Sequence, residues 1–290
     1  MSRIHRGGVA CRGGTNYNKG KIEMSGKVVM PKFSANISMM FQEVPFIERF
    51  AAAARAGFKA VEFMFPYEYP VAELRHALSS NGLKLVLINA PAGNFAAGER
   101  GMAVDPARRE EFRDGVLKAA EYAQALAVPQ INCLVGKVLP DVPAAEQRRA
   151  LVANLRFAAE TFAKAGIRLL VEHLNSRDTP GFTLDTTAKV LDVLDEVDHS
   201  NTFLQYDVYH AQRMEGELAG ILRAALPRVS HIQVADNPGR HQPGTGEINY
   251  RWLLADFISA GYQGYIGLEY IPTPDSAGSL GWVSEYGYSL

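Results

Sequence analysis

The sequence predicts a single α/β domain, a closed (β/α)8 barrel of the TIM-barrel type. Short apolar runs alternate with longer amphipathic runs eight times between residues 31 and 270, which is the pattern of parallel βα units. No change of composition divides this stretch, and barrels of roughly 250 residues form one domain. Several of the apolar runs end in an oxygen-bearing side chain, at the position where this fold places its active site.

Each predicted strand is a short run rich in Val, Ile, Leu or Phe, as is typical of strands that are buried on both faces of a parallel sheet. The predicted strands are residues 33–37, 60–64, 83–89, 130–135, 168–172, 203–207, 229–234 and 265–269.

The predicted helices begin and end at residues that favour helix termini. Asp105 and Pro106 form an N-cap followed by proline at the first helical position, and Gly57, Gly166 and Gly261 end three of the helices. The predicted helices are residues 45–56, 71–80, 106–126, 144–165, 186–197, 215–225 and 250–260. After Tyr270, two prolines and three glycines predict that an eighth helix is replaced or shortened.

Residues 1–29 differ from the rest of the chain. They hold six basic residues, one acidic residue and six glycines, a net charge of +5. We expect a disordered extension, because so few apolar side chains cannot offset the entropy of ordering. An upstream start before Met30 explains it most simply, and a nucleic-acid-binding tail or a targeting peptide is the alternative. The barrel domain should then occupy residues 30–290.

The overall composition restricts the partners of the protein. With a total charge of −1, the barrel carries about −6, which disfavours a nucleic-acid partner. No apolar run approaches the roughly 20 residues that span a bilayer, and no secretory signal is present, so we expect a cytoplasmic location without a membrane partner. Cys11 and Cys133 suggest neither a disulfide framework nor a zinc site. A homo-oligomer is compatible with the sequence.

Four consecutive predicted strands end in an oxygen-bearing side chain: Glu172, Asp207, Gln233 and Glu269. Each alone is typical of a solvated loop or a helix cap, but in a barrel all four would meet at one mouth. Three carboxylates packed together repel one another and have raised pKa values unless a cation lies among them. A set of oxygen ligands suits Mg²⁺ or Mn²⁺ better than Zn²⁺.

Six motifs, which span about residues 30–270, are distinctive: FSANISMMF, VEFMFPYEY, INCLVGK, QYDVYHAQRMEGEL, ADNPGR and PGTGEINY. Together they resemble the hydroxypyruvate isomerase family, within the xylose-isomerase-like barrels. The resemblance implies an aldose-ketose type isomerisation of a small hydroxy-oxo acid, hydroxypyruvate to 2-hydroxy-3-oxopropanoate (tartronate semialdehyde). The family's paired glutamates match Glu172 and Glu269, and its other metal ligands match Asp207 and Gln233.

This chemistry agrees with the residue types. Moving a carbonyl by one carbon through a cis-enediolate requires one group that removes a proton and one that returns it. Either Glu172 or Glu269 could take either role, while the metal stabilises the oxyanion. His210 could polarise a substrate oxygen or be a structural histidine. Arg240 could bind the substrate carboxylate or form a loop salt bridge. Asp178 is a candidate for a substrate hydroxyl.

The sequence departs from the family where substrate should bind. The family commonly has Pro-Ile-Asn where this chain has His173, Leu174 and Asn175, and the loop at 89–95 also differs. A 2-oxotetronate isomerase or a ketose 3-epimerase would share every ligand named. A metal-dependent abasic-site endonuclease needs more histidines than the six of residues 30–290. A noncatalytic sugar-binding barrel would not need a pair of proton-transfer groups.

Overall fold

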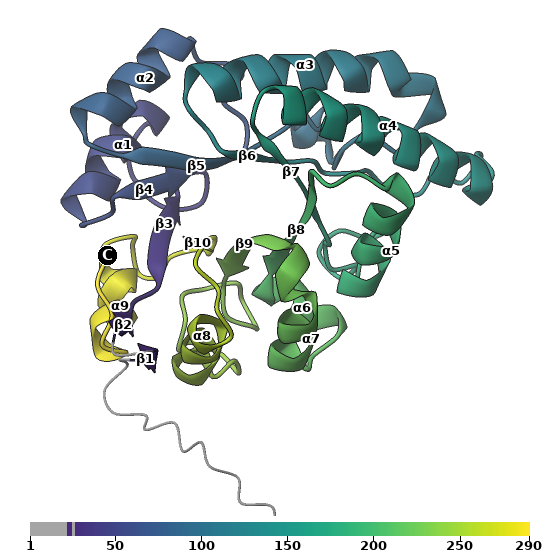
Figure 1. The fold of residues 1–290 in the computed structure, drawn as a ribbon. Coiled ribbons are helices and arrows are strands. Elements are labelled where there is room, and N and C mark those ends of the chain that lie inside the picture. Colours follow the sequence, from purple (N-terminus) through teal and green to yellow (C-terminus); the bar gives the residue numbers. More distant parts are fainter. Residues whose placement is uncertain (1–21, 25–26) are drawn as a thin grey trace, which may run out of the picture.

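The computed structural model describes residues 22–24 and 27–290 and confirms the predicted barrel. Eight parallel strands close into a ring in the order β10, β3, β4, β5, β6, β7, β8, β9, and helices surround them (Figure 1). The barrel strands are β3 (Lys32–Asn36), β4 (Ala60–Glu62), β5 (Lys84–Asn89), β6 (Gln130–Asn132), β7 (Arg168–Glu172), β8 (Thr202–Asp207), β9 (Val229–Val234) and β10 (Tyr265–Leu268). Each of these strands overlaps one of the predicted apolar runs.

The helices bury one face each against the strands. The α-helices are α1 (Phe46–Arg55), α2 (Val71–Ser80), α3 (Arg109–Ala125), α4 (Ala144–Lys164), α5 (Thr187–Val197), α6 (Val208–Met214), α7 (Leu218–Ala225), α8 (Tyr250–Ser259) and α9 (Gly281–Glu285). Short 3₁₀ helices are η1 (Phe95–Ala97), η2 (Pro106–Arg108), η3 (Leu226–Arg228) and η4 (Gly278–Leu280). Phe50, Leu155 and Phe162 are fully buried on the inner faces of their helices. The short α9 agrees with the predicted shortening of the eighth helix.

The region after the sixth predicted strand differs from the prediction of one helix at 215–225. Two helices, α6 and α7, are present, and α6 begins directly after Asp207. The Asp207 carboxylate accepts hydrogen bonds from the backbone N–H groups of Tyr209 and His210, which caps the helix. Gly216 and Glu217, both with positive φ, separate the two helices.

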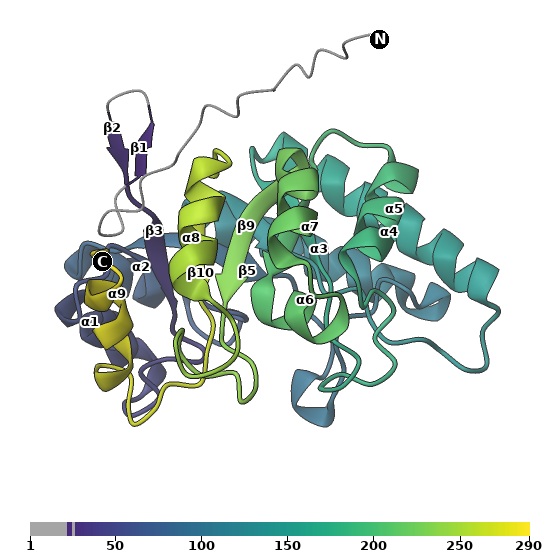
Figure 2. The same ribbon diagram turned by 90° about the horizontal axis from the view of Figure 1, so that it is seen from below.

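The predicted extension is in part a hairpin. Strands β1 (Ile22–Met24) and β2 (Lys27–Val29) pair in antiparallel fashion beside α8 (Figure 2), which the sequence did not predict. Because β2 leads into the start of β3, the hairpin lies at the end of the barrel opposite to the C-terminal strand ends. The remainder of the predicted extension, residues 1–21 and 25–26, lies outside the described residues.

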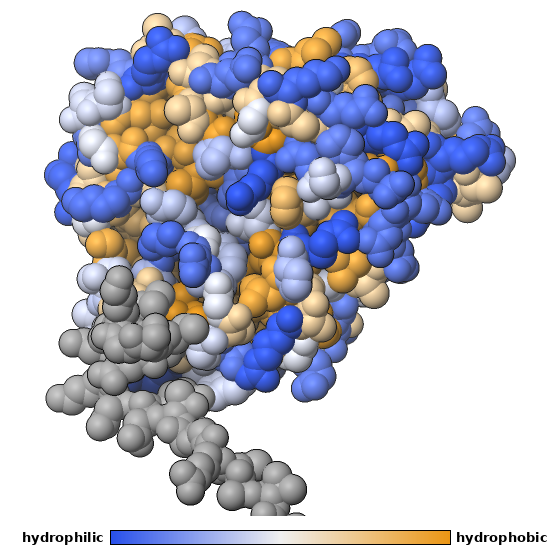
Figure 3. All heavy atoms as spheres, in the orientation of Figure 1, coloured by the Kyte–Doolittle hydropathy of each residue, from blue (hydrophilic) through white to orange (hydrophobic). Residues whose placement is uncertain are grey.

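The visible face of the molecule mixes hydrophilic residues with smaller hydrophobic patches (Figure 3). Throughout residues 22–24 and 27–290, every helix is too short or too polar to cross a membrane.

The barrel interior is polar beneath the strand ends. Glu62 on β4 accepts hydrogen bonds from Ser34 on β3 and from Gln233 on β9, and contacts the His231 ring at 2.9 Å. Since β3 and β10 separate β4 from β9, these contacts pass through the interior. Gly267 on β10 leaves the necessary space, because a Cβ atom there would overlap the Glu62 carboxylate.

Candidate active site

The structure brings the four predicted strand-end residues together at one end of the barrel. Glu172 ends β7, Asp207 ends β8, Gln233 lies near the end of β9, and Glu269 directly follows β10. All four side chains are buried. The fold therefore concentrates three carboxylates and one amide at the position where this architecture performs chemistry.

An asparagine orients each of the two glutamates. Asn132 on β6 donates to Glu172 Oε2 at 2.7 Å, and Asn36 on β3 donates to Glu269 Oε1 at 3.2 Å. The sequence analysis missed both asparagines, although each is the last residue of a barrel strand. Each bond leaves the second oxygen of the glutamate open to other partners.

Arg240 joins Asp207 to Glu269. Its Nη2 donates to Asp207 Oδ2 at 3.3 Å and to Glu269 Oε2 at 3.1 Å. Burial lowers the pKa of Arg240, but Glu269, Asp207 and Glu172 outweigh this effect and raise the pKa above its ordinary value. The guanidinium predicted to bind substrate thus already balances part of the charge of the cluster.

Burial raises the pKa values of both glutamates. Burial raises the pKa of Glu269 to about 8; the positive charge of Arg240 opposes this shift, and the negative charge of Asp207 adds to it. Burial also raises the pKa of Glu172 well above its usual range, and the nearby carboxylates of Glu269 and Asp207 add to the effect. A raised pKa brings a carboxyl group closer to neutral pH or above it, so that it can deliver a proton as well as accept one, as general acid-base catalysis requires.

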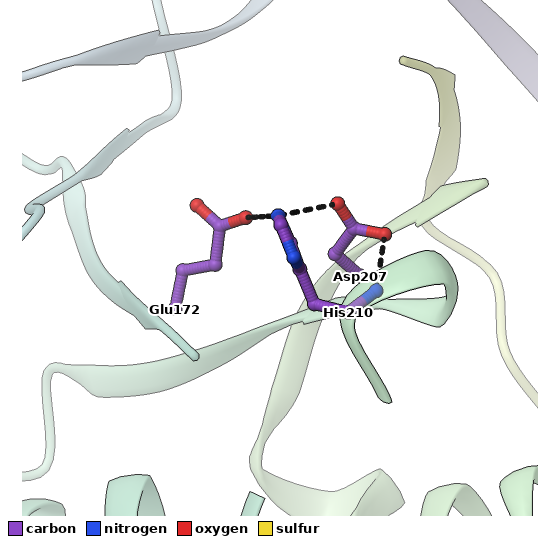
Figure 4. Close-up of side chains that lie close together, drawn as sticks. All are labelled: Glu172, Asp207 and His210. Carbon is purple, nitrogen blue, oxygen red and sulfur yellow. Dashed lines mark hydrogen bonds and ion pairs between the residues drawn. The ribbon is translucent and has the colours of Figure 1, made fainter. Parts of the chain in front are cut away.

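His210 lies between Glu172 and Asp207 (Figure 4). Its Nε2 is 3.5 Å from Asp207 Oδ2 and 4.0 Å from Glu172 Oε1. Its Nδ1 accepts a hydrogen bond from the backbone N–H of Asn175 at 3.1 Å, and burial lowers the pKa of the ring well below its ordinary value. The neutral ring therefore carries its proton on Nε2, which suits donation to an oxygen better than coordination of a metal.

The Gln233 amide is held on both sides. Its Nε2 donates to Glu62 Oε1 at 2.8 Å, and its Oε1 accepts from Gln205 Nε2 at 2.6 Å. Burial raises the pKa of Glu62, but His231, Gln233 and Ser34 outweigh it and lower the pKa below its usual value. An ionised carboxylate only accepts hydrogen bonds, so Glu62 fixes the amide orientation, and the carbonyl oxygen keeps a second lone pair.

Asp178 lies at the edge of the site. Its carboxylate accepts hydrogen bonds from the Tyr209 hydroxyl at 2.7 Å and from Asn175 Nδ2 at 3.0 Å, and it pairs with Arg213 at 3.1 Å. The predicted contact of Asp178 with a substrate hydroxyl stays a prediction.

The donors fit a hard divalent cation. Glu172, Asp207 and His210 are buried together, each with an atom within 4.8 Å of the others, a spacing that could hold a metal ion. Of the three, the two carboxylates suit a cation, whereas His210 presents its Nε2–H. With both glutamates ionised, the three carboxylates and Arg240 leave a formal charge of about −2, which one divalent cation would neutralise. Carboxylate and amide oxygens are the ligands that Mg²⁺ and Mn²⁺ prefer.

A cavity of about 180 Å³ opens above these residues. It is smaller than the roughly 300–1,000 Å³ of pockets for drug-sized ligands, so it suits a small substrate. The residues that line it are Met64, Asn89, Phe95, Arg100, Leu134, Glu172, Leu174, Asp178, Thr179, His210, Arg240 and Glu269. Sequence reasoning missed Arg100, and the signal that could have found it is a lone arginine within a long glycine-containing loop.

Comparisons with known proteins identify the family of the chain. The model of the family described as xylose isomerase-like TIM barrel matches residues 50–286. Hydroxypyruvate isomerase of Escherichia coli is 48% identical over 257 residues, which cover 89% of this chain and all of that protein. The 2-oxo-tetronate isomerase of Cupriavidus necator is 43% identical and covers 89% of this chain and 99% of its own.

Solved structures agree with the fold. One described as an AP endonuclease, family 2, from Brucella melitensis is 40% identical, has a TM-score of 0.86, and covers 89% of this chain and 99% of its own. A D-allulose 3-epimerase from Methylomonas sp. has a TM-score of 0.70 at 22% identity, covers 90% and 92% of the two chains, and shows the fold alone. The chain therefore belongs to the xylose isomerase-like TIM barrels and, among them, to the isomerases of the hydroxypyruvate isomerase family.

Proposed function

We propose that the protein interconverts hydroxypyruvate and 2-hydroxy-3-oxopropanoate (tartronate semialdehyde), using Glu172 and Glu269 as the proton-transfer pair. The observation that carries the proposal is that both glutamates are buried beside one small cavity with raised pKa values. The identity of 48% to an Escherichia coli hydroxypyruvate isomerase, over its full length, supports this substrate.

The residues divide the reaction between them. One glutamate removes a proton from the hydroxymethyl carbon of hydroxypyruvate, and the other delivers a proton to the neighbouring carbon of the cis-enediolate. The proton of the original hydroxyl passes to the oxygen of the neighbouring carbon, which leaves an aldehyde on the first carbon and a hydroxyl on the second. His210 Nε2–H donates a hydrogen bond to the oxygen on which negative charge develops. A Mg²⁺ or Mn²⁺ ion held by Glu172, Asp207, Gln233 and Glu269 would supply Lewis-acid stabilisation of that oxygen. Arg240 holds the Asp207 and Glu269 carboxylates in place by donating a hydrogen bond to each.

The direct test is incubation of the protein with hydroxypyruvate and Mg²⁺ or Mn²⁺ in D₂O, followed by NMR. We expect the aldehyde product to appear and deuterium to enter the carbon that receives the proton. Absence of turnover with both metals would overturn the proposal.

The metal ligands have their own test. Anomalous scattering from crystals soaked with Mn²⁺ should place one ion among Glu172, Asp207, Gln233 and Glu269. A strong anomalous peak elsewhere, without one at this position, would count against these ligands.

A 2-oxotetronate isomerase is the second candidate. Three relatives described as 2-oxo-tetronate isomerases are 39–43% identical over 257 residues each, and the chemistry at the strand ends would be the same. Comparison of kcat/KM for hydroxypyruvate and for 2-oxotetronate decides between them.

Other readings receive less support. Among the histidines of residues 30–290, His210 faces the acidic cluster while His231 is paired with Glu62 inside the barrel, which disfavours the multi-histidine centre of an abasic-site endonuclease. Ketose epimerases resemble this chain at identities of 19–22%, a likeness of fold. A noncatalytic sugar-binding barrel gives no reason for two buried glutamates with raised pKa values.

A further inference from the structure

The loop between β5 and η2 is fixed against the barrel close to the site. The backbone N–H of Gly101 donates to the Ala92 carbonyl at 2.9 Å, and Gly101 forms a β-bridge with Val135, just after β6. A Cβ atom at Gly101 would overlap the Leu134 carbonyl, so the loop backbone packs directly on the chain that follows β6. The residue before this anchor is Arg100.

Contacts within the loop hold the Arg100 side chain over the cavity. Its Nη1 donates to the carbonyl of Phe95 at 3.0 Å and to that of Glu99 at 2.7 Å, and its guanidinium carbon is 3.8 Å from the centre of the Phe95 ring. Arg100 lines the same cavity as Glu172 and Glu269. Its position is therefore set before any substrate arrives.

The charge of Arg100 has no carboxylate partner within the part of the chain that the structure describes. The neighbouring Glu99 carboxylate is turned toward Arg108, at 2.7 Å, and burial lowers the pKa of Arg100 without an opposing effect from an anion. A half-buried guanidinium without a counterion is costly, and its planar fork matches a carboxylate in bidentate geometry.

Arg240, the other arginine of the cavity, is committed to the acidic cluster. It donates to both Asp207 and Glu269, and moving it toward a substrate would leave these buried carboxylates without their cation. Apolar side chains of Met64 and Leu134 also line the cavity and strengthen an ion pair formed there by excluding water.

We propose that Arg100, and not Arg240, binds the carboxylate of the substrate, so that the cavity selects a short hydroxy-oxo acid over an uncharged sugar. The identity of the acid rests on the proposed function, whereas the carboxylate subsite rests on Arg100 itself. The β5–η2 loop is then the element that recognises the acid, and the strand ends perform the chemistry on its other carbons.

The kinetic test uses Arg100→Gln in the full chain with Mn²⁺. We expect KM for hydroxypyruvate to rise at least about tenfold, as for loss of a charge-assisted hydrogen bond, with kcat within about threefold of wild type. The KM of Arg100→Lys should lie between those of wild type and Arg100→Gln, because lysine restores the charge but not the planar, two-pronged geometry of the guanidinium. Arg109→Gln is the matched control, since Arg109 is exposed and pairs with the exposed Glu110, and its KM should not change.

A binding measurement tests the Arg100 subsite independently of the proposed isomerisation. Calorimetry should show that glycerate, a three-carbon hydroxy acid that lacks the reactive carbonyl, binds the Mn²⁺-loaded wild type at least about tenfold more tightly than Arg100→Gln. If wild type fails to isomerise hydroxypyruvate but this difference is found, the proposed function is wrong and the subsite stands. If turnover is normal and Arg100→Gln changes neither KM nor glycerate affinity by more than twofold, the subsite is wrong.

A fourth variant separates a direct contact of Arg100 with the ligand from an effect of loop order. Glu99→Gln weakens the link of the loop to Arg108 and leaves Arg100 in the chain. Glycerate affinity should fall much less in Glu99→Gln than in Arg100→Gln. An equal loss in both variants would mean that loop order, and not the Arg100 charge, controls binding, and would overturn the proposal.

Discussion

In protein from which divalent cations have been removed with a chelator, the free energy of unfolding should fall as the pH rises from 6.5 to 8. The cause is Glu269, because burial raises its pKa from 4.5 to about 8. The folded chain then keeps this proton up to about pH 8, while the unfolded chain releases it near pH 4.5. The contribution of the protonated Glu269 to stability is complete below pH 4.5 and is lost as the pH rises through about 8.

The expected loss is about 1.4 kcal/mol in the free energy of unfolding per pH unit, or about 2 kcal/mol over this window. Glu172 acts with the same sign, since its pKa is also raised. Burial lowers the pKa of His173 from 6.5 to about 4 and the pKa of His210 well below 6.5, and both act with the opposite sign, mainly below pH 6.5. Burial raises the pKa of Cys133 from 9 to about 12, which matters only above pH 9. The window therefore isolates the two glutamates.

Urea denaturation of the chelated protein at pH 6.5 and at pH 8 measures this difference directly. Added Mn²⁺ should remove the pH dependence, because the cation stabilises the ionised carboxylates. Glu269→Gln without metal should show a slope smaller by about 1.4 kcal/mol per pH unit. A chelated wild type that is equally stable at both pH values, or more stable at pH 8, would refute the reasoning.

Three further predictions concern the site and its support. Glu172→Gln and Glu269→Gln should each lower kcat by about 10² to 10⁴ and abolish exchange of the substrate's carbon-bound hydrogen with D₂O; near wild-type exchange would leave these acids as metal ligands only. Gly267→Ala should destabilise the fold by about 1–3 kcal/mol in urea denaturation, because its Cβ meets the Glu62 carboxylate. Gly220→Ala on α7 should be neutral or stabilising, because its Cβ would make only an ordinary contact, at 3.8 Å from Glu217 Oε2. Glu62→Gln should weaken Mn²⁺ binding by about 10- to 100-fold in calorimetry, and an unchanged Kd would show that Glu62 does not orient the ligand amide.

The strand ends were predictable because they depend on local pattern and one general rule. A buried parallel strand reads as an apolar run, and the residue that ends it is visible in the sequence, as for Glu172 and Asp207. The barrel rule then brings the C-terminal ends of all strands to one mouth. Nothing more than strand order was needed to place Glu172, Asp207, Gln233 and Glu269 near one another.

Features that depend on tertiary contacts were missed. Helix α6 has no separate start signal, because its cap is the same Asp207 that ends β8, so the prediction placed a single helix at residues 215–225. Arg100 reaches the cavity because Gly101 bridges to Val135, a contact between segments 34 residues apart. The partners of Gln233 lie on other strands, and their register is not visible in the sequence.

The two halves of the barrel contribute differently to the cavity. Segments that follow β4, β5 and β6 provide Met64, Arg100 and Leu134, while the ends of β7, β8 and β10 provide the three carboxylates and β9 provides the Gln233 amide. Substitutions in the segments that follow β4, β5 and β6 can therefore change the substrate preference while the proton-transfer groups stay in place. An engineer who wants a new substrate would accordingly randomise the β5–η2 loop and leave the second half untouched.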